Sequence, residues 1–224
     1  QVLLFPQLLF QGFRFCKIRV PCIGKHLAQV GLEARSFRLP IGQQSQHLER
    51  AVRVLRAGGV IACPTEGVWG LGCDPRNAAA VARILHLKGR SPGKGLILVA
   101  GDVEQVQPLL GRVPLSRRAE LLGSWPGPIT WIVPVGDELP RWITGKHDSV
   151  AIRVSDHFQL ASLCRMFGGP IVSTSANLQG RPAARSALAV RRYFRGAIDY
   201  LLPGELGGRR GPTTIREALS GRIV

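Results

Sequence analysis

Residues 60–75 read VIACPTEGVWGLGCDP, and this stretch contains the first strand that the sequence predicts. Residues 60–63 are all apolar and follow a pair of glycines that ends a helical pattern, as is typical of a buried strand. The polar turn PTE, with Thr65 and Glu66, comes directly after this strand. Ligands of open α/β sheets often bind beyond the carboxyl ends of strands. The stretch therefore predicts either the edge of a binding site or an ordinary turn in which Thr65 and Glu66 are cap residues.

The rest of the chain alternates between helical and strand patterns. Apolar residues at helical spacing predict helices at residues 46–56, 78–87, 103–110, 115–122, 157–167 and 187–194. Apolar runs bounded by turn residues predict further strands at residues 95–100, 129–135, 149–154, 171–174, 198–202 and 213–215. Strands interleaved with helices predict a single α/β domain with a mixed sheet.

Residues 1–40 differ from the remainder because neither helical nor strand periodicity persists through them. Their apolar part, residues 2–15, is broken by Pro6 and Gly12. It lacks the charged start and the small-residue cleavage site of a signal peptide. We interpret residues 1–40 as a non-native or disordered leader and residues 41–224 as the folded domain.

The composition limits the class of protein. With 224 residues, 45% of them hydrophobic and 20% charged, the chain suits one globular domain. No apolar run reaches the roughly 18 residues that a membrane-spanning helix needs, so no membrane partner is expected. The net charge of +16 favours polyanions such as nucleic acid or nucleotides. A basic protein without such a partner would show the same charge.

The cysteines and histidines give no sign of a metal site. The five cysteines are odd in number and include no CxxC pair, and the five histidines are scattered. A disulfide framework or a zinc site is therefore not expected, and we predict a reducing, cytoplasmic setting.

A basic loop follows the second predicted helix. The segment KGRSPGKG places Lys88, Arg90 and Lys94 within seven residues, around two internal glycines. Flexible backbone with fixed cations suits a polyphosphate. The spacing of its glycines is not that of a Walker A loop. A solvated basic turn explains the segment equally well.

Two predicted strands carry unusual polar residues. Thr130 lies near the start of the strand predicted at residues 129–135, after Pro-Gly-Pro, a rigid entry whose other residues have a structural explanation. Arg153 lies inside the apolar strand 149–154, and burying an unpaired guanidinium is costly. Arg153 therefore either faces solvent or lines a cavity and meets an anion; we favour the cavity because of the other polar clusters.

Two more polar segments follow strands. Ser173, Ser175 and Asn177 belong to STSAN, whose hydroxyl and amide groups can donate to phosphate or ribose oxygens, although such residues are also common in turns. The tail GGRRGPTTIR contains three more arginines, Arg216 among them, around glycines, and a basic surface loop is the alternative explanation.

The order of these clusters resembles the YrdC-like family of threonylcarbamoyl-AMP synthases in its short bacterial form. The resemblance covers residues 46–222, and its most specific parts are PTExVWGLGCDP, the KxR pair (Lys88, Arg90) and the SxN pair (Ser175, Asn177). Two features depart from the family. Residues 1–40 have no counterpart, and the chain stops at Val224, where relatives usually carry a few more residues.

The resemblance implies an open, twisted sheet of parallel and antiparallel strands around a large basic cavity, with residues 41–224 as the catalytic domain. It implies an L-threonylcarbamoyladenylate synthase, a nucleotidyltransferase. L-threonine and bicarbonate form a carbamate, whose carboxylate attacks the α-phosphorus of ATP and releases pyrophosphate. A separate tRNA threonylcarbamoyl-transferase complex then uses the product for tRNA modification. Mg²⁺ would accompany ATP, and no tightly bound cofactor is expected.

The resemblance also implies roles for individual residues. The catalytic pair would be Lys88 and Arg90. The nucleotide would be bound by these two together with Lys94, Thr130, Ser173, Ser175, Asn177 and Arg216. Threonine would be bound by Thr65 and Arg153, the latter through a carboxylate.

Two other functions stay open on the sequence. One is an RNA-binding module with a basic cavity and no catalysis, which would bind tRNA or double-stranded RNA mainly through the phosphate backbone. Aromatic residues make up only 6% of the chain, so no stacking surface for single strands is evident. The other is a relative that uses carbamoyl phosphate, but such chains are much longer and carry zinc-finger and acylphosphatase segments.

Overall fold

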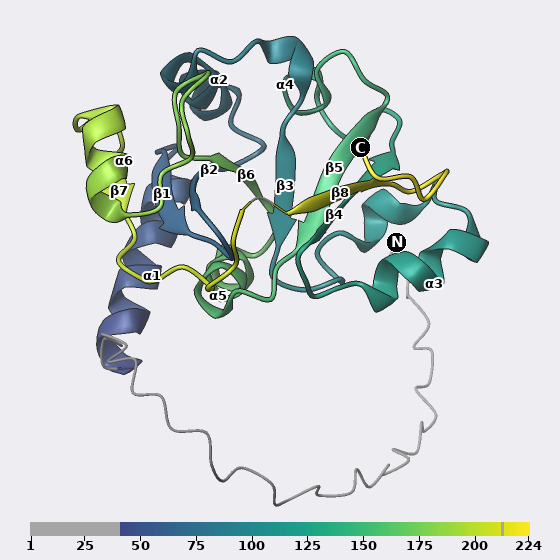
Figure 1. Cartoon of the computed structure of the whole chain (residues 1–224), viewed down its shortest axis with the longest axis horizontal. Helices are drawn as coiled ribbons and strands as arrows, with labels where there is room; N and C mark the ends of the chain where they lie inside the picture. The colour runs from purple at the N-terminus through teal and green to yellow at the C-terminus, as the bar shows by residue number, and fades with distance from the viewer. Residues whose placement is uncertain (1–40, 212) are drawn as a thin grey trace, which may run out of the picture. The chain divides into compact units, whose positions relative to one another are not determined.

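The computed structural model describes residues 41–211 and 213–224, whose trace is shown in Figure 1. The predicted leader, residues 1–40, lies outside the described residues. The helices are α1 (Ile41–Arg56), α2 (Ala78–Lys88), α3 (Leu115–Gly123), α4 (Arg141–Thr144), α5 (Phe158–Phe167) and α6 (Ala187–Phe194), with short 3-10 turns η1 (Pro92–Lys94) and η2 (Gln107–Leu110). The strands are β1 (Ile61–Pro64), β2 (Trp69–Cys73), β3 (Ile97–Ala100), β4 (Ile129–Pro134), β5 (Ser149–Val154), β6 (Ile171–Ser175), β7 (Tyr200–Leu201) and β8 (Thr214–Glu217).

These strands form one open sheet in the order β7-β1-β2-β6-β3-β5-β4-β8. The pairs β7–β1, β3–β5 and β4–β8 are parallel. The pairs β1–β2, β2–β6, β6–β3 and β5–β4 are antiparallel. The predicted α/β class with a mixed sheet is confirmed.

Both faces of the sheet are covered by helices, and β1 shows why. All four residues of β1 are buried, and successive side chains of a strand point to opposite faces. Ile61 and Cys63 pack with α1 and α5 in one apolar core, and Ala62 packs in the other core with residues of α2, α3, α4 and α6. A strand buried on both faces explains the unbroken apolar run in the sequence.

The same alternation on β5 determines where Arg153 lies. Val150, Ile152 and Val154 belong to the core that contains α2 and α3. Arg153 therefore points to the opposite sheet face, and its residue is only 6% exposed. Of the two predicted positions for Arg153, the buried one is confirmed.

Helix α2 ends where the basic loop begins. Its first turn is capped by Asn77, whose side chain accepts from the N–H of Ala80 at 3.0 Å. Its last turn is closed by Gly89, which has φ 64°, a left-handed conformation that glycine adopts without strain. The reversal at Gly89 separates Lys88 from Arg90, and the two side chains have different surroundings.

Three elements differ from the sequence prediction. Strand β2 was not predicted as a strand, although all five of its residues are buried. Helix α4 was not predicted, and the helix predicted at residues 103–110 is reduced to the 3-10 turn η2. Gly70 and Gly72 weaken the strand pattern of β2, and Pro108 interrupts the helical pattern of residues 103–110.

A search of the described residues for a helix long and apolar enough to cross a membrane finds none.

Candidate functional site

A pocket of about 270 Å³ lies on the sheet face to which Arg153 points. Its lining comes from the β1–β2 turn, β2, the basic loop after α2, β3, β5, β6, and β8 with the segment that precedes it. It consists of Thr65, Gly67, Val68, Gly70, Arg90, Leu96, Ile97, Arg153, Ser173, Thr174, Ser175, Gly211, Thr213 and Ile215. Five of the predicted site residues are in this lining: Thr65, Arg90, Arg153, Ser173 and Ser175.

The β1–β2 turn places Thr65 at the pocket. The N–H and the hydroxyl of Thr65 both donate to the carbonyl oxygen of Val68, at 3.1 and 2.8 Å. Gly70 lies beside it, and a Cβ on this glycine would lie 3.2 Å from Thr65 Cγ2 and 3.5 Å from Ser173 Oγ. The absent side chain of Gly70 therefore leaves space in the pocket between Thr65 and Ser173.

Arg153 is held in the pocket by a buried carboxylate. Its Nη2 lies 3.2 Å from Glu66 Oε2, and Glu66 Oε1 accepts from Ser155 Oγ at 2.7 Å. Burial lowers the pKa of Arg153, and the charge of Glu66 acts against that shift, so the guanidinium stays charged at neutral pH. Arg153 Nε has no hydrogen-bond partner among the described residues.

Thr213 connects Arg153 to the predicted residue Thr130. The Thr213 hydroxyl accepts from Arg153 Nη1 at 3.1 Å, and it lies 3.0 Å from the hydroxyl of Thr130. Thr130 is fully buried and is not part of the pocket lining. It reaches the pocket only through Thr213.

The segment before β8 packs on the turn that carries Thr65 and Glu66. The N–H of Gly207 donates to Thr65 O at 3.0 Å, and the N–H of Arg209 donates to Glu66 O at 2.9 Å. A Cβ on Gly67 would clash with the backbone of Gly211, so this approach requires glycine. The Gly-rich tail is therefore part of the site rather than a free surface loop.

Lys88 contacts the SxN segment, a contact that the sequence did not predict. Its Nζ donates to Ser175 O, to Asn177 O at 3.0 Å and to Asn177 Oδ1 at 2.8 Å. The Ser175 hydroxyl also donates to Asn177 Oδ1, at 2.7 Å. Burial, followed by the charge of Arg90, lowers the pKa of Lys88 to about 8.

Arg90 lines the pocket on the other side of Gly89. Its Nη2 donates to Gly95 O at 2.9 Å and more weakly to Lys94 O at 3.4 Å. Its Nε is buried without a partner among the described residues, and burial lowers its pKa. Lys94 is exposed and does not line the pocket.

Arg216 lies outside the pocket in this structure. Its Nη1 forms an ion pair with Glu120 Oε1 at 2.7 Å, and its guanidinium lies over the ring of Trp131 at 5.8 Å from the ring centroid. Arg216 is thus bound to α3, and its predicted contact with the nucleotide stays a prediction.

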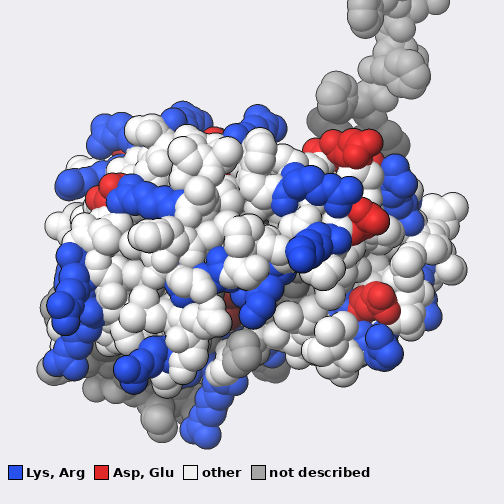
Figure 2. All heavy atoms as spheres, turned by 90° about the horizontal axis from the view of Figure 1, so that it is seen from above, with Lys and Arg blue, Asp and Glu red and all other residues white. Residues whose placement is uncertain are grey.

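Buried polar atoms without a hydrogen-bond partner favour this pocket as the candidate functional site. Among the described residues five side chains have such an atom: Glu66, Arg90, Thr144, Arg153 and Arg216. Arg90 and Arg153 line the pocket, and Glu66 pairs with Arg153. Figure 2 shows Lys and Arg side chains spread over one face of the molecule, with some beside a hollow near its middle.

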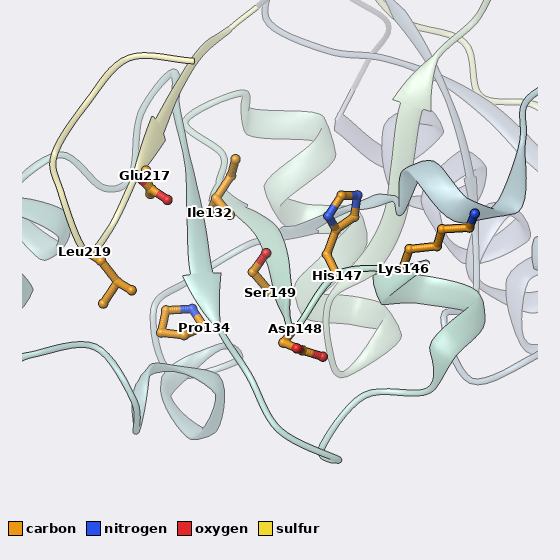
Figure 3. A pocket seen from close by; sticks show the side chains of 8 residues that line it. All are labelled: Ile132, Pro134, Lys146, His147, Asp148, Ser149, Glu217 and Leu219. Atoms are coloured by element: carbon orange, nitrogen blue, oxygen red, sulfur yellow. The ribbon is translucent and has the colours of Figure 1, made fainter.

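A second depression, of about 380 Å³, is larger but has fewer features of a binding site. Figure 3 shows its lining: Ile132, Pro134, Lys146, His147, Asp148, Ser149, Glu217 and Leu219. None of the predicted site residues is among them. Asp148 pairs with Arg141 at 3.0 Å, and Glu217 accepts from Ser220 Oγ at 2.5 Å. No lining side chain of this depression has a buried polar atom that lacks a partner within the described chain.

Glu66 and Thr213 are site residues that sequence reasoning assigned to no role. The sequence placed Glu66 in a turn and Thr213 at the start of a short predicted strand, and their common partner Arg153 lies at least 60 positions away from either. The one sequence feature that indicated a site role was the position of Glu66 directly after a predicted buried strand.

The fold and this pocket define an open α/β domain with an internal site of two arginines and several hydroxyl groups. The family model for Sua5, YciO and YrdC, described as "Telomere recombination", matches residues 53–224. The chain belongs to the Sua5/YciO/YrdC family.

Three similar proteins differ in their identity to this chain and in how much of it they cover. The Threonylcarbamoyl-AMP synthase of Pseudomonas fluorescens strain Pf0-1 is 53% identical over 180 residues, which cover 80% of this chain and 97% of the relative. The crystal structure of P. abyssi Sua5 complexed with L-threonine matches with a TM-score of 0.70 and 34% identity, over 76% of this chain and 50% of that one. The chain thus spans about half of that Sua5. E. coli YciO matches with a TM-score of 0.70 and 25% identity, over 81% of this chain and 88% of that protein.

Proposed function

We propose that the protein is an L-threonylcarbamoyladenylate synthase, which forms threonylcarbamoyl-AMP and pyrophosphate from L-threonine, bicarbonate and ATP. The observation that carries the proposal is the pocket, which brings together Thr65, Arg90, Arg153, Ser173 and Ser175 from distant parts of the chain. The P. fluorescens relative that shares 53% of its residues with the aligned region has the same activity in its name.

The reaction suits a site without a covalent nucleophile. A carboxylate oxygen of the threonine carbamate forms a bond to the α-phosphorus, and the bond from that phosphorus to the bridging oxygen breaks as pyrophosphate leaves. Such transfers depend mainly on positioning and on neutralising charge. Burial, followed by the charge of Glu66, raises the pKa of the nearby Cys63 to about 12, so this cysteine stays a thiol at neutral pH.

We assign the phosphates to the basic loop. Arg90 lines the pocket with a free Nε, and a guanidinium can hold phosphate oxygens through two parallel hydrogen bonds. Lys94, exposed on the same loop, would reach the departing pyrophosphate. Ser173 supports this assignment, because this hydroxyl residue lines the same pocket as Arg90.

We also propose substrate contacts for the remaining residues that the sequence predicted. Ser175 and Asn177 would bind phosphate or ribose oxygens, Thr130 and Arg216 the nucleotide. Thr65 would contact threonine, and Arg153 would meet a carboxylate of threonine or of the carbamate. For Arg216, binding the nucleotide requires a donor other than Nη1, which is paired with Glu120.

Mg²⁺ would enter with ATP rather than bind to a protein cage. Within the described chain there is no group of three or more His, Cys, Asp or Glu side chains placed to hold a metal ion. Lone carboxylates and phosphate oxygens are common Mg²⁺ ligands, and the ion would neutralise phosphate charge when bound. The protein residues that act on the same charge are Arg90 and Lys94.

The use of the product is part of the proposal. We place the enzyme in the cytoplasm, where a tRNA threonylcarbamoyl-transferase complex would take threonylcarbamoyl-AMP. Three buried free cysteines in the described part of the chain, Cys63, Cys73 and Cys164, suit a reducing compartment. The net charge of +16 would favour an approach to tRNA.

One assay tests the proposal. Purified protein is incubated with ATP, Mg²⁺, threonine and bicarbonate, and pyrophosphate and the mixed anhydride are measured. We expect pyrophosphate only when threonine and bicarbonate are both present. ATP turnover that is equal without threonine would refute the assignment, and RNA binding without any turnover would favour the RNA-binding alternative.

A further inference from the structure

The hydrogen bonds of Lys88 leave no donor for a ligand. An ammonium group has three N–H donors and no acceptor. Lys88 Nζ donates to Ser175 O, to Asn177 O and to Asn177 Oδ1. All three donors are thus used within the protein, so a phosphate oxygen could be bound only if one of these bonds broke.

The three acceptors belong to a single turn at the end of β6. Further bonds hold the same turn: the N–H of Asn177 donates to Ser175 O at 3.0 Å, and Asn177 Nδ2 donates to Arg181 O at 2.7 Å. The backbone of Lys88 also takes part, since the N–H of Gln179 donates to Lys88 O at 2.9 Å. The end of α2 is therefore fixed to residues 175–179 by both its side chain and its backbone.

Lys88 lies outside the pocket lining, while the turn that it holds reaches the pocket. Lys88 is 6% exposed, whereas Ser175 and Arg90 both line the pocket. No carboxylate within the described chain forms an ion pair with Lys88, so its charge is not compensated. Arg153 differs in this respect, because Glu66 pairs with it.

We propose that Lys88 is a positioning residue of the synthase: it fixes the turn of residues 175–177 that presents Ser175 to the pocket, and it acts on the nucleotide through this turn and through its uncompensated charge, without touching ATP. The effect of Lys88 on the nucleotide rests on the proposed function, whereas its fixing of the turn does not. Direct contact with ATP is then the task of Arg90.

Hydrogen exchange without any nucleotide tests the fixing of the turn. We compare wild-type protein with Lys88→Met, which keeps an unbranched side chain as far as Cε and removes the ammonium donors. Amide exchange in residues 175–181 is expected to be at least about tenfold faster in the variant, because the turn loses the bonds that close it. Unchanged exchange in residues 175–181 would overturn the proposal, whether or not the protein makes threonylcarbamoyl-AMP.

Arg90→Ala is the matched control for this experiment. Arg90 is the other cation of the KxR pair, and it is bonded to Lys94 O and Gly95 O rather than to the turn. Its removal is expected to speed exchange in residues 91–96 and to leave residues 175–181 unchanged. If Lys88→Met does not fold, Asn177→Ala removes one acceptor from the same cluster and should speed exchange in residues 178–181.

A kinetic double-mutant cycle tests how Lys88 acts on the reaction. If Lys88 acts through the turn, Lys88→Met combined with Asn177→Ala should lose about as much kcat/KM as the worse single variant. Combined with Arg90→Ala, the losses should multiply, because Arg90 makes a separate contact. Losses that multiply in the first pair would overturn the proposal. A wild-type protein without pyrophosphate release would refute the proposed function and leave the exchange result valid.

Discussion

Glu66 and Arg153 form an ion pair inside the protein, with Arg153 Nη2 3.2 Å from Glu66 Oε2 and side chains that are only 3% and 7% exposed. The pair joins the turn after β1 to β5, four positions across the sheet. It also reduces the net charge that Arg153 offers to an anion. A substrate carboxylate would therefore meet an arginine whose position is fixed by Glu66 and Thr213.

The first prediction concerns the stability that depends on this pair. Glu66→Ala is expected to lower the free energy of unfolding by about 3–5 kcal/mol, because it leaves Arg153 as an uncompensated buried charge. For a domain of this size that corresponds to a fall in Tm of about 2–4 °C for each kcal/mol. Asp148→Ala is the control: its pair with Arg141 is 85% and 68% exposed and should be worth at most about 1 kcal/mol. Equal melting temperatures for the two variants would contradict the prediction.

The second prediction concerns Arg90 as a phosphate ligand. Arg90→Ala is expected to lower the rate of pyrophosphate release about a hundredfold, since removal of a donor aimed at developing charge commonly costs on the order of 3 kcal/mol. Arg90→Lys should also be impaired, because an ammonium cannot reproduce a two-pronged guanidinium contact. The loss should appear in kcat as well as in KM for ATP, because pyrophosphate gains charge as it leaves.

A distant cation provides the control for Arg90. Arg112 is 60% exposed, forms an ion pair with Glu138 and is not in the pocket lining. Arg112→Ala should leave the rate unchanged, and all variants should keep melting temperatures close to that of the wild type. Near-normal turnover by Arg90→Ala would refute the phosphate role of the basic loop.

The third prediction concerns pH. Burial lowers the pKa of Lys88 to about 8, below the value of about 10.4 for an unfolded chain. Between these two values the unfolded state binds more protons, so the contribution of Lys88 to stability rises with pH. Above about pH 8 the folded protein loses the protonated Lys88 amine, which donates to three acceptors of the turn. Activity should therefore fall as the pH rises through about 8.

Comparing the wild type with Lys88→Met separates the effect of Lys88 on stability, which rises with pH, from its effect on activity, which falls. From pH 7 to pH 10, the free energy of unfolding of the wild type should rise relative to that of the variant, and its advantage in activity should shrink. Denaturant unfolding and pyrophosphate release at each pH give the two curves. If the difference in unfolding free energy and the difference in activity changed with pH in the same direction, the titration of Lys88 would not explain both.

The fold could be predicted where the sequence pattern is local. Strand β5 and helix α6 were predicted with the observed bounds, because apolar periodicity and flanking turn residues mark both. Strand β2 was missed because Gly70 and Gly72 interrupt its apolar pattern. A Cβ on Gly72 would lie 3.1 Å from Val172 O of the neighbouring strand, so its glycine reflects a close approach that only the fold reveals.

The site could be predicted only in part, because contacts between residues that are distant in the sequence depend on the fold. Lys88 and Asn177 were named as members of two motif pairs, and the structure brings them within 2.8 Å. The sequence did not show that Arg153 pairs with Glu66, because a strand pattern gives the face of a residue but not its partner across the sheet. The position of Arg216 outside the pocket lining, where it pairs with Glu120, depends on tertiary contacts in the same way.

The fourth prediction concerns residues 1–40. Deleting them is expected to leave Tm and pyrophosphate release nearly unchanged, because the sequence shows no periodic apolar face before residue 41 that could dock on the domain. The aligned 180 residues also cover 97% of the P. fluorescens relative. Differential scanning calorimetry of residues 41–224 beside the full chain gives the comparison. A fall in Tm of more than a few degrees would show that the segment packs on the domain.

The last prediction concerns which substrate lies beside Thr65. A Cβ on Gly70 would lie 3.2 Å from Thr65 Cγ2 and 3.5 Å from Ser173 Oγ, so Gly70→Ala should fold with small shifts and reduce the space beside Thr65. If threonine lies there, KM for threonine should rise roughly tenfold while KM for ATP changes little, since one methyl group in a pocket is worth about 1–3 kcal/mol. Gly123→Ala is the control, because a Cβ on Gly123 meets no atom within 4 Å. A rise in KM for ATP with an unchanged KM for threonine would place the nucleotide, and not the amino acid, beside Thr65.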